Sequence, residues 1–181
     1  MLPGEREAMM RYSMFILPLL AALAASSAAR AEDRLPPSSV DYAGFQALVV
    51  ELAEIRDTRL LAREEFFARA RSDDALILDT RSAEAFAAGH VEGAVNLPFS
   101  DFTQDKLLAV IGPDRDRPIF IYCNNNFTED AFPVRLKRAP LALNIPTFVN
   151  LFGYGYTNVW ELEGTMTTDE VPWVRAPVLQ D

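Results

Sequence analysis

Two short, uninterrupted apolar runs constrain the fold more than any other feature of the sequence. One run is Ala75–Leu78, which is followed by Asp79, and the other is Ile119–Tyr122, which is followed by Cys123. Runs of four apolar residues without polar alternation are typical of strands that are covered on both faces, as in a parallel sheet. Both runs therefore predict central strands, each with a polar or reactive residue at its carboxyl end.

Helical patterns alternate with strand patterns along the rest of the chain. Residues 41–56 repeat apolar side chains at helical spacing, and we expect this stripe to lie in the core (Phe45, Leu48, Val49, Leu52 and Ile55). Further helices are expected over 63–71, 82–88, 103–111 and 146–152, and further strands over 60–62, 94–97 and 158–162. Gly89 is expected to end its helix in the left-handed conformation. The alternation predicts an α/β domain with a largely parallel sheet.

The N-terminus has the layout of a secretory signal peptide. Arg6 and Arg11 precede the apolar run 14–25, and Ala29-Arg30-Ala31 follows as a small-x-small cleavage site. The run is shorter than the roughly 20 apolar residues that a membrane-spanning helix requires. We therefore expect cleavage after Ala31, a periplasmic or secreted protein, and no membrane span in the mature chain.

The remainder is expected to form one domain. We assign residues 32–58 to a linker and the amphipathic helix, 59–166 to the domain itself, and 167–181 to a C-terminal tail. Half of the residues are hydrophobic, which is enough for a packed core. The net charge of −9 offers no electrostatic surface for nucleic acid.

Cys123 is the one cysteine of the chain, so it cannot form an internal disulfide. Such a cysteine is either buried and inert or a reactive thiol. Its position after a buried strand and before Asn124-Asn125-Asn126 favours the reactive alternative, because functional groups gather at the carboxyl ends of parallel strands. Asparagines tolerate positive φ, so this loop is expected to turn backbone N–H groups inward and to lower the pKa of the thiol.

Three segments, taken together, resemble the rhodanese family. Leu78–Pro98 is similar to its first signature block in the Asp-x-Arg start, the Gly-His pair and the closing Asn-Leu-Pro. Ile119–Cys123 resembles the strand that leads to the family's persulfide cysteine, and Gly155–Gly164 resembles its closing segment. The resemblance covers roughly residues 59–164.

This resemblance implies a three-layer fold with a mostly parallel five-stranded sheet between helices. It also implies that Cys123 accepts sulfane sulfur from a thiosulfate- or persulfide-like donor and passes it to a thiol or another thiophilic acceptor, without a metal or cofactor. The active-site loop would then be Asn124, Asn125, Asn126, Phe127 and Thr128. We expect Asp79 and Arg81 to form a mutually satisfied pair that supports this loop, and His90 to have a structural role.

The loop departs from the family pattern because it lacks a basic residue. Glu129 and Asp130 follow it instead, and two nearby carboxylates are expected to raise the thiol pKa and to repel an anion. We hypothesise that the segment 131–146 folds over Cys123 and supplies positive charge; its cations are Arg135, Lys137 and Arg138. The alternative is a solvated basic loop.

Three functions are compatible with these features. The first is a sulfurtransferase, and the second is a rhodanese-like module that binds a protein partner or ligand with little catalysis. The third, an oxyanion-binding phosphatase or arsenate reductase, is disfavoured, because Thr128 and Glu129 stand where a clamping arginine is needed.

Overall fold

A computed structural model describes residues 40–175, and the predicted signal peptide lies outside this range. Its helices are α2 (Tyr42–Asp57), α3 (Arg63–Arg69), α4 (Ala83–Ala88), α5 (Gln104–Ile111) and α6 (Asn144–Gly153). Its strands are β1 (Leu60–Leu61), β2 (Leu76–Asp79), β3 (Gly89–Val91), β4 (Val95–Asn96), β5 (Ile119–Tyr122), β6 (Val159–Leu162) and β7 (Trp173–Arg175). Within this part of the chain, no helix is both long and apolar enough to cross a membrane.

Five strands form a parallel sheet in the order β1-β6-β5-β2-β4, and β3 and β7 form a separate antiparallel ribbon. The two apolar runs of the sequence are the adjacent central strands β2 and β5, in which Asp79 lies opposite Tyr122. The predicted α/β fold with a five-stranded parallel sheet is therefore confirmed. Because Asp79 is paired with Tyr122, the residue after Asp79 and Cys123 both follow their strands at the same edge of the sheet.

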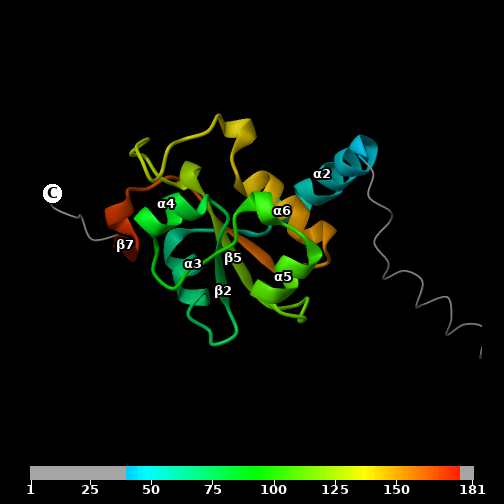
Figure 1. Ribbon diagram of the computed structural model, residues 1–181, viewed down its shortest axis with the longest axis horizontal. Coiled ribbons are helices and arrows are strands. Elements are labelled where there is room, and N and C mark those ends of the chain that lie inside the picture. The colour runs from blue at the N-terminus through cyan, green and yellow to red at the C-terminus, as the bar shows by residue number, and fades with distance from the viewer. Residues whose placement is uncertain (1–39, 176–181) are drawn as a thin grey trace, which may run out of the picture. The chain divides into compact units, whose positions relative to one another are not determined.

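The sheet is the middle of three layers (Figure 1). Helices α2, α5 and α6 contribute to one apolar cluster with alternate residues of the sheet, among them Leu78, Ile119, Ile121 and Val159. Helix α3 and the β3–β7 ribbon contribute to a second cluster, which contains Phe66, Phe120, Tyr122, Phe127 and Leu162. Because side chains alternate along a strand, odd-numbered residues of β5 and β6 face α6 and even-numbered residues face α3.

Helix α2 forms where its sequence predicts, but its apolar stripe is only partly in the core. Leu52 is buried, whereas Phe45 and Val49 are exposed, so the expectation that the whole stripe is core was wrong. The reason is that α2 packs mainly against α6, so it does not lie along the sheet over its full length. Leu48, Leu52 and Ile55 are the residues of α2 that pack against the domain core.

Gly89 ends α4 as predicted, but not in the left-handed conformation. Its φ is 173°, which is extended, and the residue begins strand β3. A glycine is required there for a different reason, since a Cβ atom would lie 2.7 Å from the indole nitrogen of Trp173. Close packing of the β3–β7 ribbon, and not backbone conformation, explains this residue.

The segment 167–175, which was predicted to be part of a C-terminal tail, is folded onto the domain. Met166 and Val171 are buried in the second cluster, and Trp173–Arg175 form β7 against β3. Four polar residues separate Met166 from Val171, and Pro172 precedes the two apolar residues Trp173 and Val174, so the pattern is too short to predict a strand. Residues 166–175 therefore belong to the packed domain.

Candidate functional site

Cys123 lies directly after β5, at the carboxyl edge of the sheet, and is 1% exposed. The following Asn124–Asn126 form one 3-10 turn. In the described chain Asp130 is the one non-glycine residue with positive φ, so the left-handed asparagines expected from the sequence are absent from this loop. The loop therefore closes on itself instead of opening into a ring of inward N–H groups.

Asn126 locks the loop in this closed form. Its side-chain oxygen accepts the Cys123 backbone N–H at 2.9 Å, and its side-chain nitrogen donates to the carbonyls of Leu162 and Gly164 at 2.8 and 3.1 Å. The backbone N–H groups of Asn126 and Phe127 donate to carbonyls within the turn itself. The Asn126 N–H also contacts the Cys123 side chain, as in a capping box, so these N–H groups hold the turn and its cysteine together.

The sulfur of Cys123 nevertheless faces backbone N–H groups from two segments. They belong to Asn144 and Leu143, at the start of α6, and to Asn125 in the loop, and each lowers the thiol pKa. Burial acts in the opposite direction and is the largest cause, and the Glu161 carboxylate adds to it, so the pKa of Cys123 is raised overall. The expectation of a lowered pKa was wrong because burial outweighs the N–H groups.

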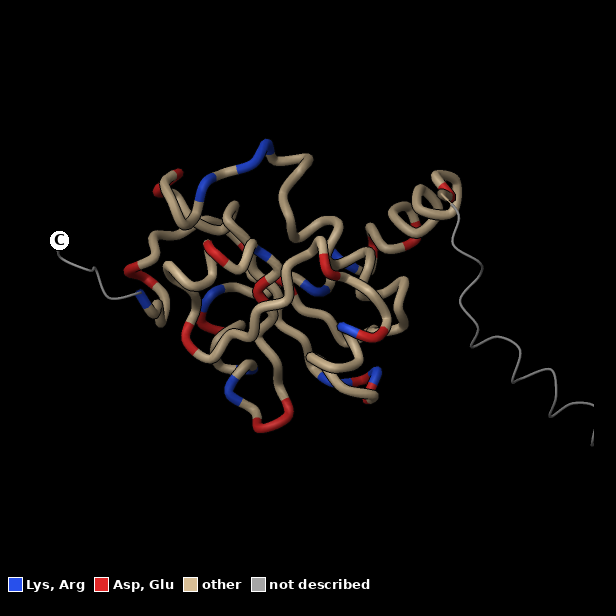
Figure 2. The backbone as a smooth tube through the Cα atoms, viewed as in Figure 1, with Lys and Arg blue, Asp and Glu red and all other residues tan. Residues whose placement is uncertain are grey.

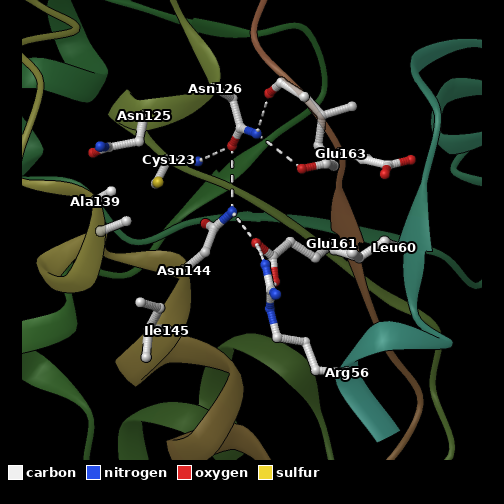
Figure 3. A pocket seen from close by; sticks show the side chains of 13 residues that line it. Arg56, Leu60, Cys123, Asn125, Asn126, Ala139, Asn144, Ile145, Glu161 and Glu163 are labelled. Carbon is white, nitrogen blue, oxygen red and sulfur yellow. Dashed lines mark hydrogen bonds and ion pairs between the residues drawn. The ribbon is translucent and has the colours of Figure 1, made fainter. Parts of the chain in front are cut away.

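A chain of polar contacts connects α2 to Cys123 (Figure 3). Arg56 donates to both carboxylate oxygens of Glu161 at 2.8 Å. Asn144 donates from its side-chain nitrogen to Glu161 at 3.2 Å and to Asn126 at 3.3 Å, and Asn126 in turn holds the Cys123 N–H. None of Arg56, Asn144 and Glu161 was identified from the sequence, although a glutamate inside an apolar strand was a signal that could have been used.

These residues line a cleft of about 380 Å³ that contains Cys123 (Figure 3). Of the predicted loop residues, Asn125 and Asn126 line it as well. Asn124 instead lines a separate hollow of about 310 Å³ together with Thr80 and Lys137. Thr128 lines neither of these two hollows, and it pairs its backbone N–H with the carbonyl of Met166.

The basic segment lies beside the loop, but its cations do not line the cleft. Asn125 clamps Lys137 through two side-chain contacts to its backbone, at 2.7 and 3.2 Å. The cleft receives Ala139 and Ala142 from this segment, and neither Arg135 nor Arg138. Figure 2 shows the basic residues on the outer run of this segment. Among residues 40–175, the one cation that lines the cleft is Arg56, which belongs to α2.

The carboxylates that follow the loop also lie away from the thiol. Glu129 accepts the N–H of Thr168 at 2.6 Å, and Asp130 accepts the N–H of Leu136 at 2.9 Å. The carboxylate that raises the thiol pKa is Glu161. The predicted direction of this electrostatic effect was right, but it was assigned to the wrong acids.

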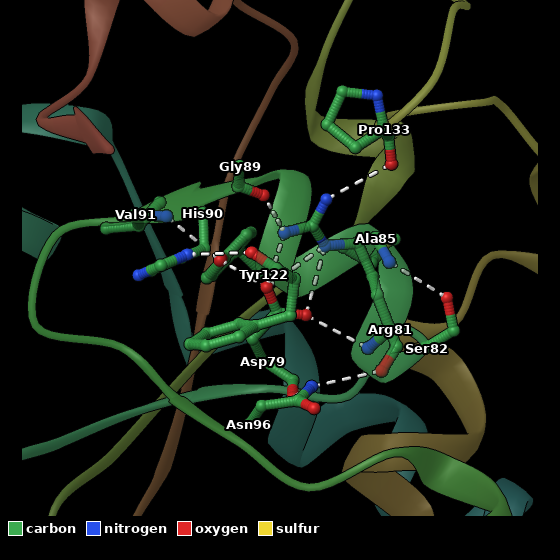
Figure 4. A network of polar contacts seen from close by, with 12 residues as sticks. Asp79, Arg81, Ser82, Ala85, Gly89, His90, Val91, Asn96, Tyr122 and Pro133 are labelled. Atoms are coloured by element: carbon green, nitrogen blue, oxygen red, sulfur yellow. Dashed lines mark hydrogen bonds and ion pairs between the residues drawn. The ribbon is translucent and has the colours of Figure 1, made fainter. Parts of the chain in front are cut away.

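Asp79 and Arg81 form the expected pair, with 0% and 1% of their side chains exposed and a shortest distance of 2.6 Å (Figure 4). Arg81 also donates to the carbonyls of Gly89 and Pro133, at 2.8 and 3.2 Å, and Tyr122 donates its hydroxyl to Asp79. The pair thus ties β2 to the β3 strand and to the segment after the loop. It has a supporting position, on the face of the sheet opposite Glu161.

Phe127 and His90 have structural contacts. Phe127 is fully buried against Tyr122 and Trp173. The His90 ring stacks on Phe86, and its Nδ1 lies 2.8 Å from the Phe86 carbonyl. Among residues 40–175, no group of three or more His, Cys, Asp or Glu side chains is arranged to hold a metal ion.

The comparisons with known proteins identify the family of this domain. The model of the rhodanese-like domain family matches residues 63–168. The chain therefore belongs to the rhodanese-like domain family. The match includes the whole loop, Cys123 and Glu161, but ends before β7.

Two curated relatives align with the chain over short segments. An HTH-type transcriptional regulator of Mycobacterium tuberculosis, Rv0324, is 31% identical over 67 residues, which are 37% of this chain and 28% of the regulator. The uncharacterised protein YqhL of Bacillus subtilis is 35% identical over 71 residues, which are 39% of this chain and 52% of YqhL. The chain thus spans about half or less of these relatives.

Solved structures of similar fold include two proteins of low sequence identity. The Alr3790 protein from Anabaena sp. is 18% identical, with a TM-score of 0.42 over 62% of this chain and 90% of that chain. A rhodanese-related protein from Thermoplasma volcanium is 15% identical, with a TM-score of 0.44 over 64% of this chain and 97% of that chain.

Proposed function

We propose that this protein carries sulfane sulfur as a persulfide on Cys123. The observation that supports this most strongly is the set of backbone N–H groups, from Asn125, Leu143 and Asn144, that face the sulfur at the carboxyl edge of the sheet. N–H groups at the start of a helix stabilise negative charge, here on a thiolate or on a persulfide. Membership of the rhodanese-like family supports the same chemistry.

The transfer requires no cofactor and no change in the number of electrons. The Cys123 thiolate attacks the outer sulfur of a persulfide donor R–S–SH, an S–S bond forms to Sγ, and the donor's S–S bond breaks to release R–S⁻. An acceptor thiolate then attacks the outer sulfur of the Cys123 persulfide in the same way. The burial of Cys123, which is 1% exposed, limits the contact of this intermediate with water.

The experiment is an intact-mass measurement of the protein after incubation with polysulfide or thiosulfate. We expect a gain of one sulfur atom, which cyanide removes as thiocyanate and which Cys123→Ser does not acquire. Asn124→Ser serves as a matched control, because Asn124 lies next to Cys123 but outside the cleft. Absence of the gain with every donor contradicts the proposal.

A binding module with little catalysis is the second candidate. It is favoured by the 1% exposure and the raised pKa of Cys123, since both slow a nucleophilic thiol. The same measurement separates the two functions, because a binding module acquires no sulfur.

We also propose that the protein is exported. The basic start, the short apolar run 14–25 and the Ala29-Arg30-Ala31 site support this proposal. Export predicts that a periplasmic or secreted fraction contains a polypeptide that begins at Glu32. A chain that remains intact in the cytoplasmic fraction contradicts it.

A further inference from the structure

The cation in the cleft is not free to bind an anionic donor. Arg56 directs its Nε and one Nη at the two oxygens of Glu161, both at 2.8 Å. A guanidinium recognises an oxyanion through such a pair of N–H groups. Because this pair already holds a carboxylate, an incoming oxyanion must compete with Glu161 for Arg56.

Other groups of the cleft carry negative charge or the negative end of a dipole. Glu161 is 5% exposed, and Glu163 lines the same cleft without an ion pair to any residue from 40 to 175. The Asn144 side-chain oxygen is buried, and no described group donates to it. Its orientation is fixed, because the amide nitrogen donates to Glu161 and Asn126.

The backbone N–H groups in the cleft are the positive ends of peptide dipoles, and they are directed at the sulfur of Cys123. The N–H groups of Leu143, Asn144 and Asn125 act on Sγ of Cys123. They can stabilise a charge on Cys123, but they do not form a second anion site for the remainder of a donor. The cations of the basic segment lie outside the lining of the cleft.

We infer that the cleft selects organic persulfides whose carbon skeleton carries no net negative charge, and an ammonium group above all, over oxyanion donors such as thiosulfate. This inference rests on the proposed function and specifies its donor. An ammonium near the sulfur of the donor is attracted by Glu163, which has no ion pair among residues 40–175, and by the Asn144 side-chain oxygen, which accepts no hydrogen bond from a described residue. A sulfonate or carboxylate in that place is repelled by the same groups.

The test compares two persulfides that share a two-carbon spacer and carry terminal groups of opposite charge, those of cysteamine and of 3-mercaptopropionate. The rate of sulfur gain at Cys123 is measured by intact mass, and each rate is divided by that of the same donor with free mercaptoethanol, to remove intrinsic reactivity. We expect the ammonium donor to be preferred by about tenfold, as a single charge interaction at a few ångströms supplies.

Charge variants assign this preference to the cleft. Glu163→Gln is expected to reduce the preference severalfold, because it removes a cleft carboxylate without breaking an ion pair. Glu129→Gln makes the same change in charge outside the cleft and is expected to leave the preference unchanged. Equal normalised rates for both donors, or faster reaction with the carboxylate, overturn the inference while the carrier function stands. Failure of every donor overturns the carrier function itself.

Discussion

Asp79 and Glu161 are two buried carboxylates near the carboxyl ends of parallel strands, and each pairs with an arginine. Asp79 has its partner two residues away, and both side chains are almost fully buried. Glu161 has its partner 105 residues away, on α2, and the Arg56 side chain is 36% exposed. Strand alternation places Glu161 on the face of Cys123 and Asp79 on the other face. The two ion pairs are similar in composition but have different roles, because they lie on opposite faces of the sheet.

The largest expected difference between the two pairs is in stability. Asp79→Asn leaves the buried Arg81 guanidinium without a counter-charge, and we expect it to lower the free energy of unfolding by about 3–5 kcal/mol. Glu161→Gln leaves Arg56 able to turn toward water, so its effect is expected to be clearly smaller. Denaturant unfolding of both variants measures the difference. Equal losses contradict the distinction, and Asp169→Asn, in an exposed pair, provides the baseline.

Next in size is the effect on the reactivity of the thiol. Glu161→Gln removes the carboxylate that raises the pKa of Cys123 and leaves Arg56 unneutralised, so the pKa is expected to fall. Alkylation by iodoacetamide at neutral pH is then expected to accelerate by roughly three- to tenfold.

Arg56→Gln is the opposite change, since it removes the cation and keeps the carboxylate. It is expected to slow alkylation. A Glu161→Gln protein that is folded but no more reactive than the wild type contradicts the electrostatic role of Glu161.

The pH dependence of the wild-type protein tests the direction of the pKa shift. Because burial raises the pKa of Cys123, the alkylation rate is expected to keep rising beyond the pH at which an unperturbed thiol is fully ionised. The unfolded chain releases this proton at lower pH, so the folded state also loses stability as the pH rises through that interval. Cys123→Ser is expected to lack this loss, and stopped-flow alkylation with parallel unfolding curves measures both effects.

The smallest effect is expected from the basic segment. The triple variant Arg135→Ala, Lys137→Ala and Arg138→Ala removes three exposed charges that do not line the cleft, and the remaining long-range attraction is screened by salt. We expect the rate with thiosulfate to change by no more than about twofold. A large decrease would restore the hypothesis that this segment supplies the missing positive charge.

Much of the fold was predictable from local patterns. The runs that became β2 and β5, the helices, and the place of Cys123 at a strand end all follow from apolar periodicity and from the rules for parallel sheets. The segment 166–175 was not predictable in this way, because its apolar residues are stabilised by contacts with β3 and Phe127.

The site was predictable in position but not in electrostatics. Sequence neighbours of Cys123, such as Glu129, suggested the wrong acid, because the turn carries them away from the thiol. The groups that act on the thiol come from the loop residue Asn125, from β6 and from the start of α6, and α2 supplies the Arg56 that pairs with Glu161. Nothing in their local sequence marks them as a set.

By itself, then, the sequence determined a parallel α/β domain of the rhodanese-like family with one cysteine at the end of a central strand. Only the tertiary structure decided that Arg56 is neutralised by Glu161, that Asn126 closes the loop, and that burial raises the pKa of the Cys123 thiol. The physical reason is that strand and helix formation depend on local periodicity. Burial and charge at Cys123 depend on residues that lie far apart in sequence and meet only when α2 and α6 pack beside the sheet.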